Sequence, residues 1–507
     1  MILPAPLGVP PLDGGIALKL HQTLVGAGPP VVGLRRVRAL PRIENTNSAR
    51  EHGDVVELAS GARVENLVIG PAARGGIYGS NVNYIVVRGD DVSATNSSCT
   101  TGFVVQPFTL PTLAPGVGVP FSSGLPNGWA AIMIDQSHGA TGVSVSGNYV
   151  HDAGCADGID VRASGSADVG VRIERNMLTR LREGANQQSV LAIGLQTTNT
   201  ATLSARVDGN KESYIGTATV GDFGDADSEG LFANSAGHSR LVEHADHNTF
   251  AHGLGHLSAN CFEAAASNGG PTMHLTLTHS TCDYVVGDIL EADNLSRDAT
   301  LTFLVDHVRA DHSTFVGAEA FHQVEPGDDG DCMLEVASGS GSTTNVTIDN
   351  SQLTNCVADG LGVVSNAVDG PGAPVKQLGF DIERSRISSN KLSNLRVANV
   401  TPITELQGKV QQSDLSRSGG TALILEGLDT SGGTHAQLDF GGGSLGSIGD
   451  NCIYDGNPLD AELLRDSAIA RNDWWGQPGG PTPGQVIAAG ASLDTAHPLT
   501  HAPAGTC

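Results

Sequence analysis

A short pattern of alternating apolar residues recurs along the chain and limits its fold more than any other feature. Apolar residues stand seven and five positions before a final apolar residue, and a small polar residue, usually Asn or Ser, stands two positions before it. Period-2 alternation predicts a half-buried strand, and the polar residue predicts a bend after it. The pattern is clearest in segments 143–150 (VSVSGNYV), 171–178 (VRIERNML), 275–282 (LTLTHSTC), 346–353 (VTIDNSQL) and 380–387 (FDIERSRI).

Clearly adjacent copies of this pattern lie 28 to 38 residues apart. A strand-only unit of this length cannot bury its apolar face alone, so such units stack as a parallel β-solenoid, an all-β fold that allows one long domain. The predicted inward column consists of Val150, Leu178, Cys282, Phe315, Leu353, Ile387 and Leu415. The predicted polar ladder at the corner consists of Asn148, Asn176, Ser280, Ser313, Ser351 and Ser385.

Two end segments extend this interpretation. Residues 14–28 (GGIALKLHQTLVGAG) look like the opening coil of secreted bacterial β-helix surface proteins, and residues 472–481 (NDWWGQPGGP) look like the terminal element of many such helices. With its repeats, the chain resembles the right-handed parallel β-helix (pectate-lyase-like) superfamily over roughly residues 45–475. The resemblance implies a right-handed parallel β-helix with end caps, but no single activity, because this architecture hosts lyases, hydrolases, epimerases and adhesins.

The expected organisation has three parts and several protruding loops. We expect an N-terminal cap and first coil over 1–45, the β-helix over 46–460 and a C-terminal capping segment over 461–507. The repeat is interrupted, and loops are therefore expected to protrude, near 104–130, 198–236 and 325–344. Long loops on a rigid scaffold often carry its binding function.

The net charge of the chain excludes some classes of binding partner. The chain carries a net charge of -26 with only five lysines. A field of this sign repels nucleic acid and anionic membranes, and it disfavours polyuronates unless Ca²⁺ bridges the charges. Because the sequence has no run of 18 or more apolar residues, we expect no membrane insertion.

The cysteines point to an oxidising compartment. There are eight, an even number with no CxxC pair, which favours disulfides over a zinc or redox motif. Neighbour pairing is the simplest connectivity: Cys99 with Cys155, Cys261 with Cys282, Cys332 with Cys356, and Cys452 with Cys507. We therefore expect an extracellular or cell-surface location. The first residues lack the features of a signal peptide, which fits either a mature fragment or cytoplasmic residence.

Acids and histidines recur next to each other. The hexapeptide ADHNTF (245–250) returns as ADHSTF (310–315), and LTHSTC (277–282) is a weaker copy between them. Aligned on their last residue, these copies predict two outward columns on stacked coils. The candidate catalytic residues from these columns are Asp246, His247, His279, Asp311, His312 and Asp349.

Three interpretations of these columns remain open. A carboxylate orients an adjacent imidazole and raises its basicity, which suits a general acid or base, with Asp311 and His312 as the leading pair. Converging imidazoles can instead bind a transition metal. Alternatively, the columns form a solvated stripe that repeats because duplicated coils repeat their sequence.

Calcium is a separate possibility. In DFGDADSEG (222–230), the residues Asp222, Asp225, Asp227 and Glu229 could supply hard oxygen ligands, as could GDDGD (327–331). The spacing resembles the start of an EF-hand loop, but Ala236 stands where the bidentate acid is needed. The choice is therefore between a Ca²⁺ site of another kind and an acidic loop without an ion.

Two function classes follow from these observations. The first is an extracellular or cell-surface scaffold, similar to an adhesin, that binds a glycan or a surface partner along its long face. The alternative is a polysaccharide-cleaving hydrolase or lyase that uses the Asp and His residues. The near absence of lysine and the few aromatic residues disfavour an enzyme acting on uronates.

Overall fold

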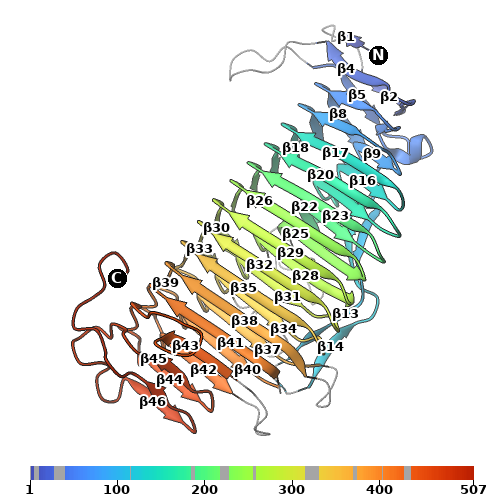
Figure 1. Ribbon diagram of the computed structural model, residues 1–507. Coiled ribbons are helices and arrows are strands. Elements are labelled where there is room, and N and C mark those ends of the chain that lie inside the picture. Colours follow the sequence, from blue (N-terminus) through green and yellow to red (C-terminus); the bar gives the residue numbers. More distant parts are fainter. Residues whose placement is uncertain are drawn as a thin grey trace. The chain divides into compact units, whose positions relative to one another are not determined.

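The computed structural model describes residues 2–4, 11–27, 40–112, 114, 116–183, 189–216, 228–254, 259–314, 330–368, 374–401, 403–427 and 436–507. The chain divides into two compact units, the first formed by Met1–Gln106 with Gly124–Ala259 and the second by Pro107–Ser123 with Asn260–Cys507. In each unit, strands stack in parallel into three sheets, here called A, B and C (Figure 1). The predicted right-handed parallel β-helix is confirmed.

In the first unit, each coil passes from sheet A through sheet B to sheet C. Sheet A contains β1 (Ile2–Pro4), β4 (Thr23–Ala27), β7 (Arg63–Glu65), β10 (Ile85–Arg88), β17 (Ala140–Ser146), β20 (Asp168–Glu174), β23 (Thr202–Asp208) and β26 (Arg240–Asp246). Sheet B contains β2 (Leu12–Asp13), β5 (Arg42–Asn45), β8 (Val68–Ala72), β11 (Asp91–Ser93), β18 (Tyr149–His151), β21 (Met177–Thr179), β24 (Lys211–Ser213) and β27 (Thr249–Ala251). Sheet C contains β3 (Ile16–Ala17), β6 (Val56–Glu57), β9 (Ile77–Ser80), β16 (Ile132–Gln136), β19 (Ile159–Ala163), β22 (Val190–Thr197) and β25 (Ser228–Gly237). A short 3-10 helix, η1 (Glu51–Gly53), precedes β6.

The second unit repeats the same order. Sheet A contains β29 (Thr272–Thr278), β32 (Thr300–Asp306), β35 (Thr343–Asp349), β38 (Val375–Glu383), β41 (Ile403–Gln411), β43 (Ala436–Gly441), β45 (Ala468–Ala470) and β47 (Leu493–Asp494). Sheet B contains β30 (Thr281–Val286), β33 (Arg309–Thr314), β36 (Gln352–Thr354) and β39 (Arg386–Ser388). Sheet C contains β28 (Phe262–Gly269), β31 (Leu290–Asn294), β34 (Met333–Ala337), β37 (Leu361–Ser365), β40 (Leu395–Asn399), β42 (Leu423–Gly427), β44 (Ala461–Leu464) and β46 (Val486–Ala489).

The alternation read from the sequence accounts for the inward faces. In β20, Val169, Val171 and Ile173 are buried while their neighbours face outward. Residue by residue, β20 pairs with β17 and β23, so buried side chains stack on buried side chains along the coils. Successive side chains of a strand point to opposite faces, which is why a period of two produces a continuous core.

The predicted polar ladder exists, although some of its members differ from the prediction. In the first unit, Asn148, Asn176, Asn210 and Asn248 form a chain in which each amide Nδ2 donates to the next Oδ1 over 3.0–3.1 Å. In the second unit, the backbone N–H of Ser351 donates to Ser385 Oγ, and the N–H of Ser385 donates to Ser413 Oγ. These bonds satisfy backbone and amide groups that the corner buries.

The predicted inward column needs one correction. Cys282 pairs with Ala310 rather than with Phe315, and Ala310 in turn pairs with Leu353. Phe315 lies outside the described residues. The hexapeptides ADHNTF and ADHSTF therefore occupy different places: the first spans the end of β26 in sheet A, and the second lies in β33 of sheet B. Aligning the copies on their last residue gave the wrong register because similar short sequences occur at two different corners of a coil, one after sheet A and one in sheet B.

Two of the three expected loops contain strands of sheets A, B and C. Residues 202–208 form β23 because Leu203, Ala205 and Val207 alternate inward, and residues 333–337 form β34. Residues 198–236 and 325–344 are therefore only partly loops. Residues 461–507, expected to form a cap, also continue the coils, since β44 and β46 pair with each other in sheet C. The segment near 104–130 stands apart as two antiparallel hairpins, β12 (Thr101–Val105) with β15 (Leu125–Gly128) and β13 (Phe108–Pro111) with β14 (Gly118–Phe121).

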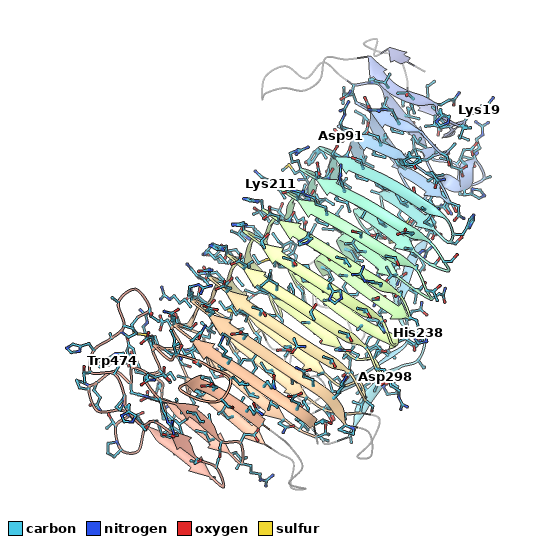
Figure 2. The ribbon with its side chains drawn as sticks, in the orientation of Figure 1. Lys19, Asp91, Lys211, His238, Asp298 and Trp474 are labelled. Carbon is cyan, nitrogen blue, oxygen red and sulfur yellow. A yellow bond between two sulfur atoms is a disulfide. The ribbon has the colours of Figure 1, made fainter. Side chains whose placement is uncertain are left out.

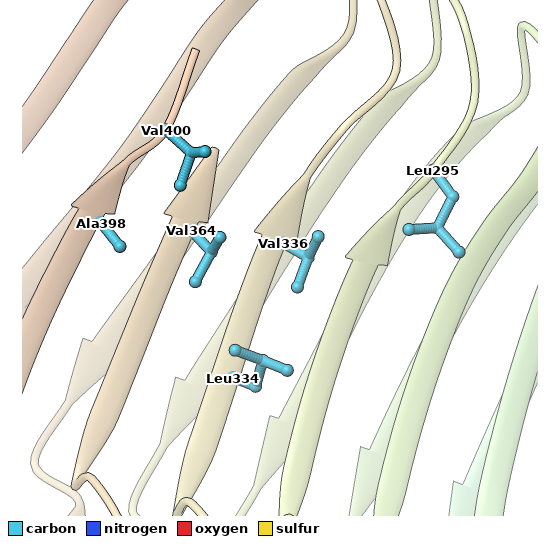
Figure 3. Close-up of a cluster of buried hydrophobic side chains, with 6 residues drawn as sticks. All are labelled: Leu295, Leu334, Val336, Val364, Ala398 and Val400. Carbon is cyan, nitrogen blue, oxygen red and sulfur yellow. The ribbon is translucent and has the colours of Figure 1, made fainter. Parts of the chain in front are cut away.

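The hairpin β13–β14 covers the outer face of sheet C in the second unit. Phe108 and Leu110 pack against a cluster formed by Leu295, Leu334, Val336, Val364, Ala398 and Val400 (Figure 3). The buried side chain of Asn366 donates to the backbone carbonyls of Thr112, Ala114 and Val117 and so holds the turn between the two strands. The segment is therefore a fixed cover over sheet C.

The expected neighbour pairing of the cysteines is confirmed. The disulfides are Cys99–Cys155, Cys261–Cys282, Cys332–Cys356 and Cys452–Cys507. Such a set is typical of proteins that fold in an oxidising compartment. Within the described ranges, we find no helix with the length and hydropathy of a membrane span.

Candidate functional site

Sheet B is bordered by two lines of corner residues with left-handed backbone. One line follows sheet A and is called the A–B line; in the second unit it consists of His279, His307, Asn350, Arg384 and Gln412. The other line follows sheet B and is called the B–C line; there it consists of Tyr284, His312, Asn355, Ser389 and Arg417. All ten have φ between 45° and 65°. This conformation costs an L-residue other than glycine about 1–2 kcal/mol.

The first unit has the same two lines with different residues. Its A–B line contains Gly89, Gly147, Arg175, Gly209 and His247. Its B–C line contains Ala94, Asp152, Arg180, Tyr214 and His252. Glycine therefore occupies three A–B corners of the first unit, whereas its B–C line carries large side chains that a corner does not require.

Each Asp-His dipeptide forms the same local pair. His247 Nδ1 lies 2.8 Å from Asp246 Oδ2, His307 Nδ1 lies 2.7 Å from Asp306 Oδ1, and His312 Nδ1 lies 3.0 Å from Asp311 Oδ2. In each pair the aspartate ends or lies in a strand and the histidine takes the left-handed corner position. The carboxylate thus lies beside Nδ1 of the imidazole in each pair, and in the pair of Asp311 and His312 this is an ion-pair contact without hydrogen-bond geometry.

The leading candidate pair lies in a network of the second unit. The side chain of Asp311 is 4% exposed and accepts hydrogen bonds at Oδ1 from Thr354 Oγ1 over 2.8 Å and from Asn355 Nδ2 over 2.6 Å. At Oδ2 it accepts from Arg309, whose Nη1 also lies 3.3 Å from Asp283 Oδ2. Burial acts to raise the pKa of Asp311, but the hydrogen bonds from Asn355 and Thr354 and the charge of Arg309 outweigh it, so the pKa is lowered. Asp311 is therefore a fixed anion and not an acid.

His312 is the member of this network whose second ring nitrogen has no described contact. Its side chain is 42% exposed, and both of its carboxylate contacts, 3.0 Å to Asp311 and 3.7 Å to Asp283, are made by Nδ1. Its ring stacks on Tyr284 with centroids 4.8 Å apart and planes inclined by 19°. Within the described parts of the chain, no ion-pair or hydrogen-bond contact engages Nε2. That nitrogen can therefore accept or donate a proton.

The other candidates lie on the A–B side of sheet B or in the first unit. His279 stacks on His307 with ring centroids 5.1 Å apart. Asp349 pairs in register with Asp306, not with Asp311, and forms an ion pair with Arg384 over 2.7 Å. The predicted column of Asp311 next to Asp349 is therefore wrong, because the step from β29 to β32 is 28 residues rather than 33. Asp246 and His247 belong to the first unit.

The first unit holds a second network that the repeat alignment did not reveal. His151 Nε2 lies 2.9 Å from Asp91 Oδ1, and its Nδ1 lies 2.6 Å from Asp152 Oδ2. The ring stacks on Tyr149 with centroids 4.0 Å apart. Arg180 Nη2 donates to Asp152 Oδ2 over 2.8 Å and to the Tyr149 hydroxyl over 3.3 Å. A short HD dipeptide was the only sequence signal, since Asp91 lies 60 residues away.

Charge in this network favours the protonated imidazole. The hydrogen bond to Asp91 is the main cause that raises the pKa of His151, and the bond to Asp152 adds to it against the opposing effect of burial. The pKa of Asp152 is lowered, chiefly by the hydrogen bond from Arg180. Figure 2 shows where this network begins: Asp91 and Lys211 lie along one edge of the ribbon, in the outward column that also contains Tyr149 and Met177.

Some of the candidate residues lie close enough together to ligate a metal ion. Ligand atoms of Asp283, Asp311 and His312 lie within 4.8 Å of one another, but the guanidinium of Arg309 already contacts both carboxylates. Glu229, from the predicted calcium segment, is a buried residue of β25. The other predicted ligands, Asp222, Asp225 and Asp227, and most of GDDGD lie outside the described residues.

Two acids of the first unit, one in sheet B and one in sheet A, point into the core. Glu212 and Glu243 lie in inward columns of the first unit, and burial raises the pKa of each to about 8. Both are therefore neutral inside the coil near pH 7. No ligand can reach them, and they belong to the core.

The comparisons with known proteins place no constraint on these networks. A comparison of the chain with protein-family models, with curated proteins and with solved structures gave no match.

Proposed function

We propose that this protein is an extracellular or cell-surface β-helix scaffold, similar to an adhesin, that binds glycans along the outer face of sheet B. The observation that carries the proposal is the B–C line. It holds Tyr214, His252, Tyr284 and His312 in left-handed conformation, where glycine would fold at lower cost. Backbone strain that a fold retains is often linked to function.

The rings on this line have the properties of a binding surface. Tyr214 stacks on His252 in the first unit, with centroids 5.1 Å apart, and Tyr284 stacks on His312 in the second. The two tyrosines are 47% and 48% exposed. A tyrosine ring offers a rigid apolar face with a polar tip, and neighbouring charged groups supply hydrogen bonds for hydroxyls. The four disulfides support the extracellular location.

Retention on immobilised polysaccharides tests this proposal. We expect the protein to be retained on a neutral glucan, mannan, galactan or chitin column, and we expect Tyr284→Ala and Tyr214→Ala to reduce retention. Tyr84→Ala is the matched control, since Tyr84 is 75% exposed and also left-handed but lies on the turn before β10 of sheet A. Equal loss in all three variants, or retention on none of the glycans, would refute binding at sheet B.

A polysaccharide-cleaving hydrolase or lyase is the second candidate function. It is favoured by His312, whose carboxylate contacts are all made by Nδ1. With Asp311 holding Nδ1, the exposed Nε2 could remove or deliver a proton at a sugar hydroxyl or ring carbon. Incubation with neutral and acidic polysaccharides, with and without Ca²⁺, followed by assays for reducing ends and unsaturated sugars, tests this. Cleavage that His312→Ala abolishes would establish the enzyme, and the absence of cleavage would leave the scaffold.

A further inference from the structure

A pocket of about 270 Å³ lies in the second unit near its last coils, beside Cys452 and Trp474, which continue the column of sheet B beyond its last strand through isolated parallel bridges. It is smaller than the roughly 300–1,000 Å³ of pockets that hold drug-sized ligands, so it suits one sugar ring better than an oligosaccharide. Its walls come from the segment before β44 and from the segment that follows Trp474, which is labelled in Figure 2.

The pocket is held in shape by the backbone around it. The N–H of Ile453 donates to the carbonyl of Trp474 over 2.9 Å, and the N–H of Asp460 donates to the carbonyl of Gln485 over 2.9 Å. Gly476 has φ +75°, and a Cβ there would lie 3.1–3.3 Å from the Tyr454 side chain, so glycine permits the close contact. Disulfide Cys452–Cys507 fixes the same region. Such preorganisation reduces the entropy cost of binding.

The lining has the chemistry of a site for hydroxyl groups. Asp455 and Asp460 supply carboxylates, Gln477 and Gln485 supply amides, and Tyr454 and Trp475 supply rings. Carboxylates accept hydrogen bonds from hydroxyls, and amides both donate and accept them. No Lys or Arg is among the described lining residues, which disfavours an anionic ligand.

Two polar atoms of this lining lack partners. Trp475 is 2% exposed, and neither its Nε1 nor Gln485 Oε1 has a hydrogen-bond partner among the described residues. Buried indole N–H groups are usually bonded. A hydroxyl both accepts and donates, so these two atoms are candidate partners for ligand hydroxyls.

We propose that this pocket binds one neutral sugar residue, such as the terminal or side-branch residue of a glycan. The pocket shares no lining residue with the proposed glycan-binding rings of sheet B, and it would stand if those rings bound nothing. It would equally leave glycan binding at sheet B intact if it failed.

Saturation-transfer NMR on the full chain tests the proposal. The probes are the methyl glycosides of glucose, mannose, galactose and N-acetylglucosamine, with galacturonate and choline as charged comparisons. We expect saturable binding of at least one neutral glycoside, with a Kd on the order of 1 mM. Gln485→Ala and Asp460→Asn should each weaken binding about tenfold. Gln437→Ala, at an exposed residue of β43, should leave it unchanged.

A second variant separates binding from folding. Thr482 is exposed at the pocket, so Thr482→Trp should fill it and abolish binding while the thermal unfolding midpoint stays near that of the wild type. Three results would overturn the proposal: no neutral glycoside binds, binding survives in the folded Gln485→Ala and Thr482→Trp variants, or galacturonate or choline binds more tightly than every neutral glycoside.

Discussion

His151 in the first unit and His312 in the second differ in one respect despite similar surroundings. Each imidazole stacks on a tyrosine and approaches two aspartates. His151 uses both ring nitrogens for these contacts, and its side chain is 17% exposed. His312 uses Nδ1 for both, and its side chain is 42% exposed.

This difference decides what each histidine can do. An imidazole held by carboxylates at both nitrogens is stabilised as a cation and has no nitrogen left for a ligand. An imidazole held at one nitrogen is oriented and keeps the other for a partner. We therefore interpret His151 as a structural residue of its network and propose His312 as the functional histidine of the sheet B face.

The largest effect should come from deleting each imidazole. His312→Ala should weaken retention on a neutral glycan about tenfold or more, and if the protein cleaves polysaccharide it should lower the rate about 10²–10⁴-fold. His151→Ala should change neither. The comparison fails if both variants lose function equally while each remains folded by circular dichroism.

Stability should respond most to the buried aspartate. Asp311→Ala removes the acceptor of Thr354 Oγ1 and Asn355 Nδ2 and one of the two carboxylates that Arg309 contacts, and leaving such donors unsatisfied costs about 1–3 kcal/mol of unfolding free energy. The Asp152 side chain is 48% exposed, so Asp152→Ala should cost about 1 kcal/mol or less. Chemical denaturation of both variants measures the gap, and equal losses would show that the two networks are equivalent.

Replacing the histidine by glycine rather than by alanine should raise the unfolding free energy at position 312 and lower it at position 151. His312 has φ 62°, so His312→Gly should be more stable than His312→Ala by about 1–2 kcal/mol. His151 is a strand residue of β18, so His151→Gly should be less stable than His151→Ala by about 0.5–1 kcal/mol. Both pairs delete the imidazole, which isolates the backbone. If glycine stabilised the protein relative to alanine at both positions, the left-handed backbone of His312 would not be the cause of the effect.

The smallest effect concerns pH. Because the pKa of His151 is raised in the folded protein, its contribution to stability is complete below the ordinary histidine value of about 6.5 and is lost as pH rises through the folded value. NMR titration should give His151 a midpoint above that ordinary value. Asp91→Asn should lower the midpoint and flatten the fall of stability with pH. An unchanged midpoint would show that Asp91 does not hold the imidazole.

Features that depend on residues close together in the sequence could be predicted from the sequence. Alternation in segments such as 171–178 predicted buried strands because side-chain direction alternates with each residue. The pairing of Asp311 with His312 was predictable because adjacent residues at a corner remain within reach in any register. Neighbour pairing of cysteines was correct because stacked coils bring residues about one or two turns apart into contact.

Contacts between residues on different coils were predicted less accurately from the sequence. Residues 245–250 and 310–315 are nearly identical in sequence, yet Asp246 ends a strand of sheet A while Asp311 lies in a strand of sheet B, since one coil step of 28 residues shifted the register. The His151 network was missed because Asp91 and Arg180 reach it from neighbouring coils. The pocket lined by Trp475 was not predicted from the sequence, because residues 472–481 were interpreted only as a capping element.

The amino-acid sequence by itself determined that this chain stacks strands in parallel, that Asp-His dipeptides form oriented pairs and that cysteines join nearby coils, because each of these follows from spacing within one or two coils. Only the tertiary structure decided which pairs share a face and which imidazole keeps a nitrogen for a partner. The physical reason is register: coil lengths vary, so the residue above or below any position is set by the packing of whole coils and not by resemblance between short segments.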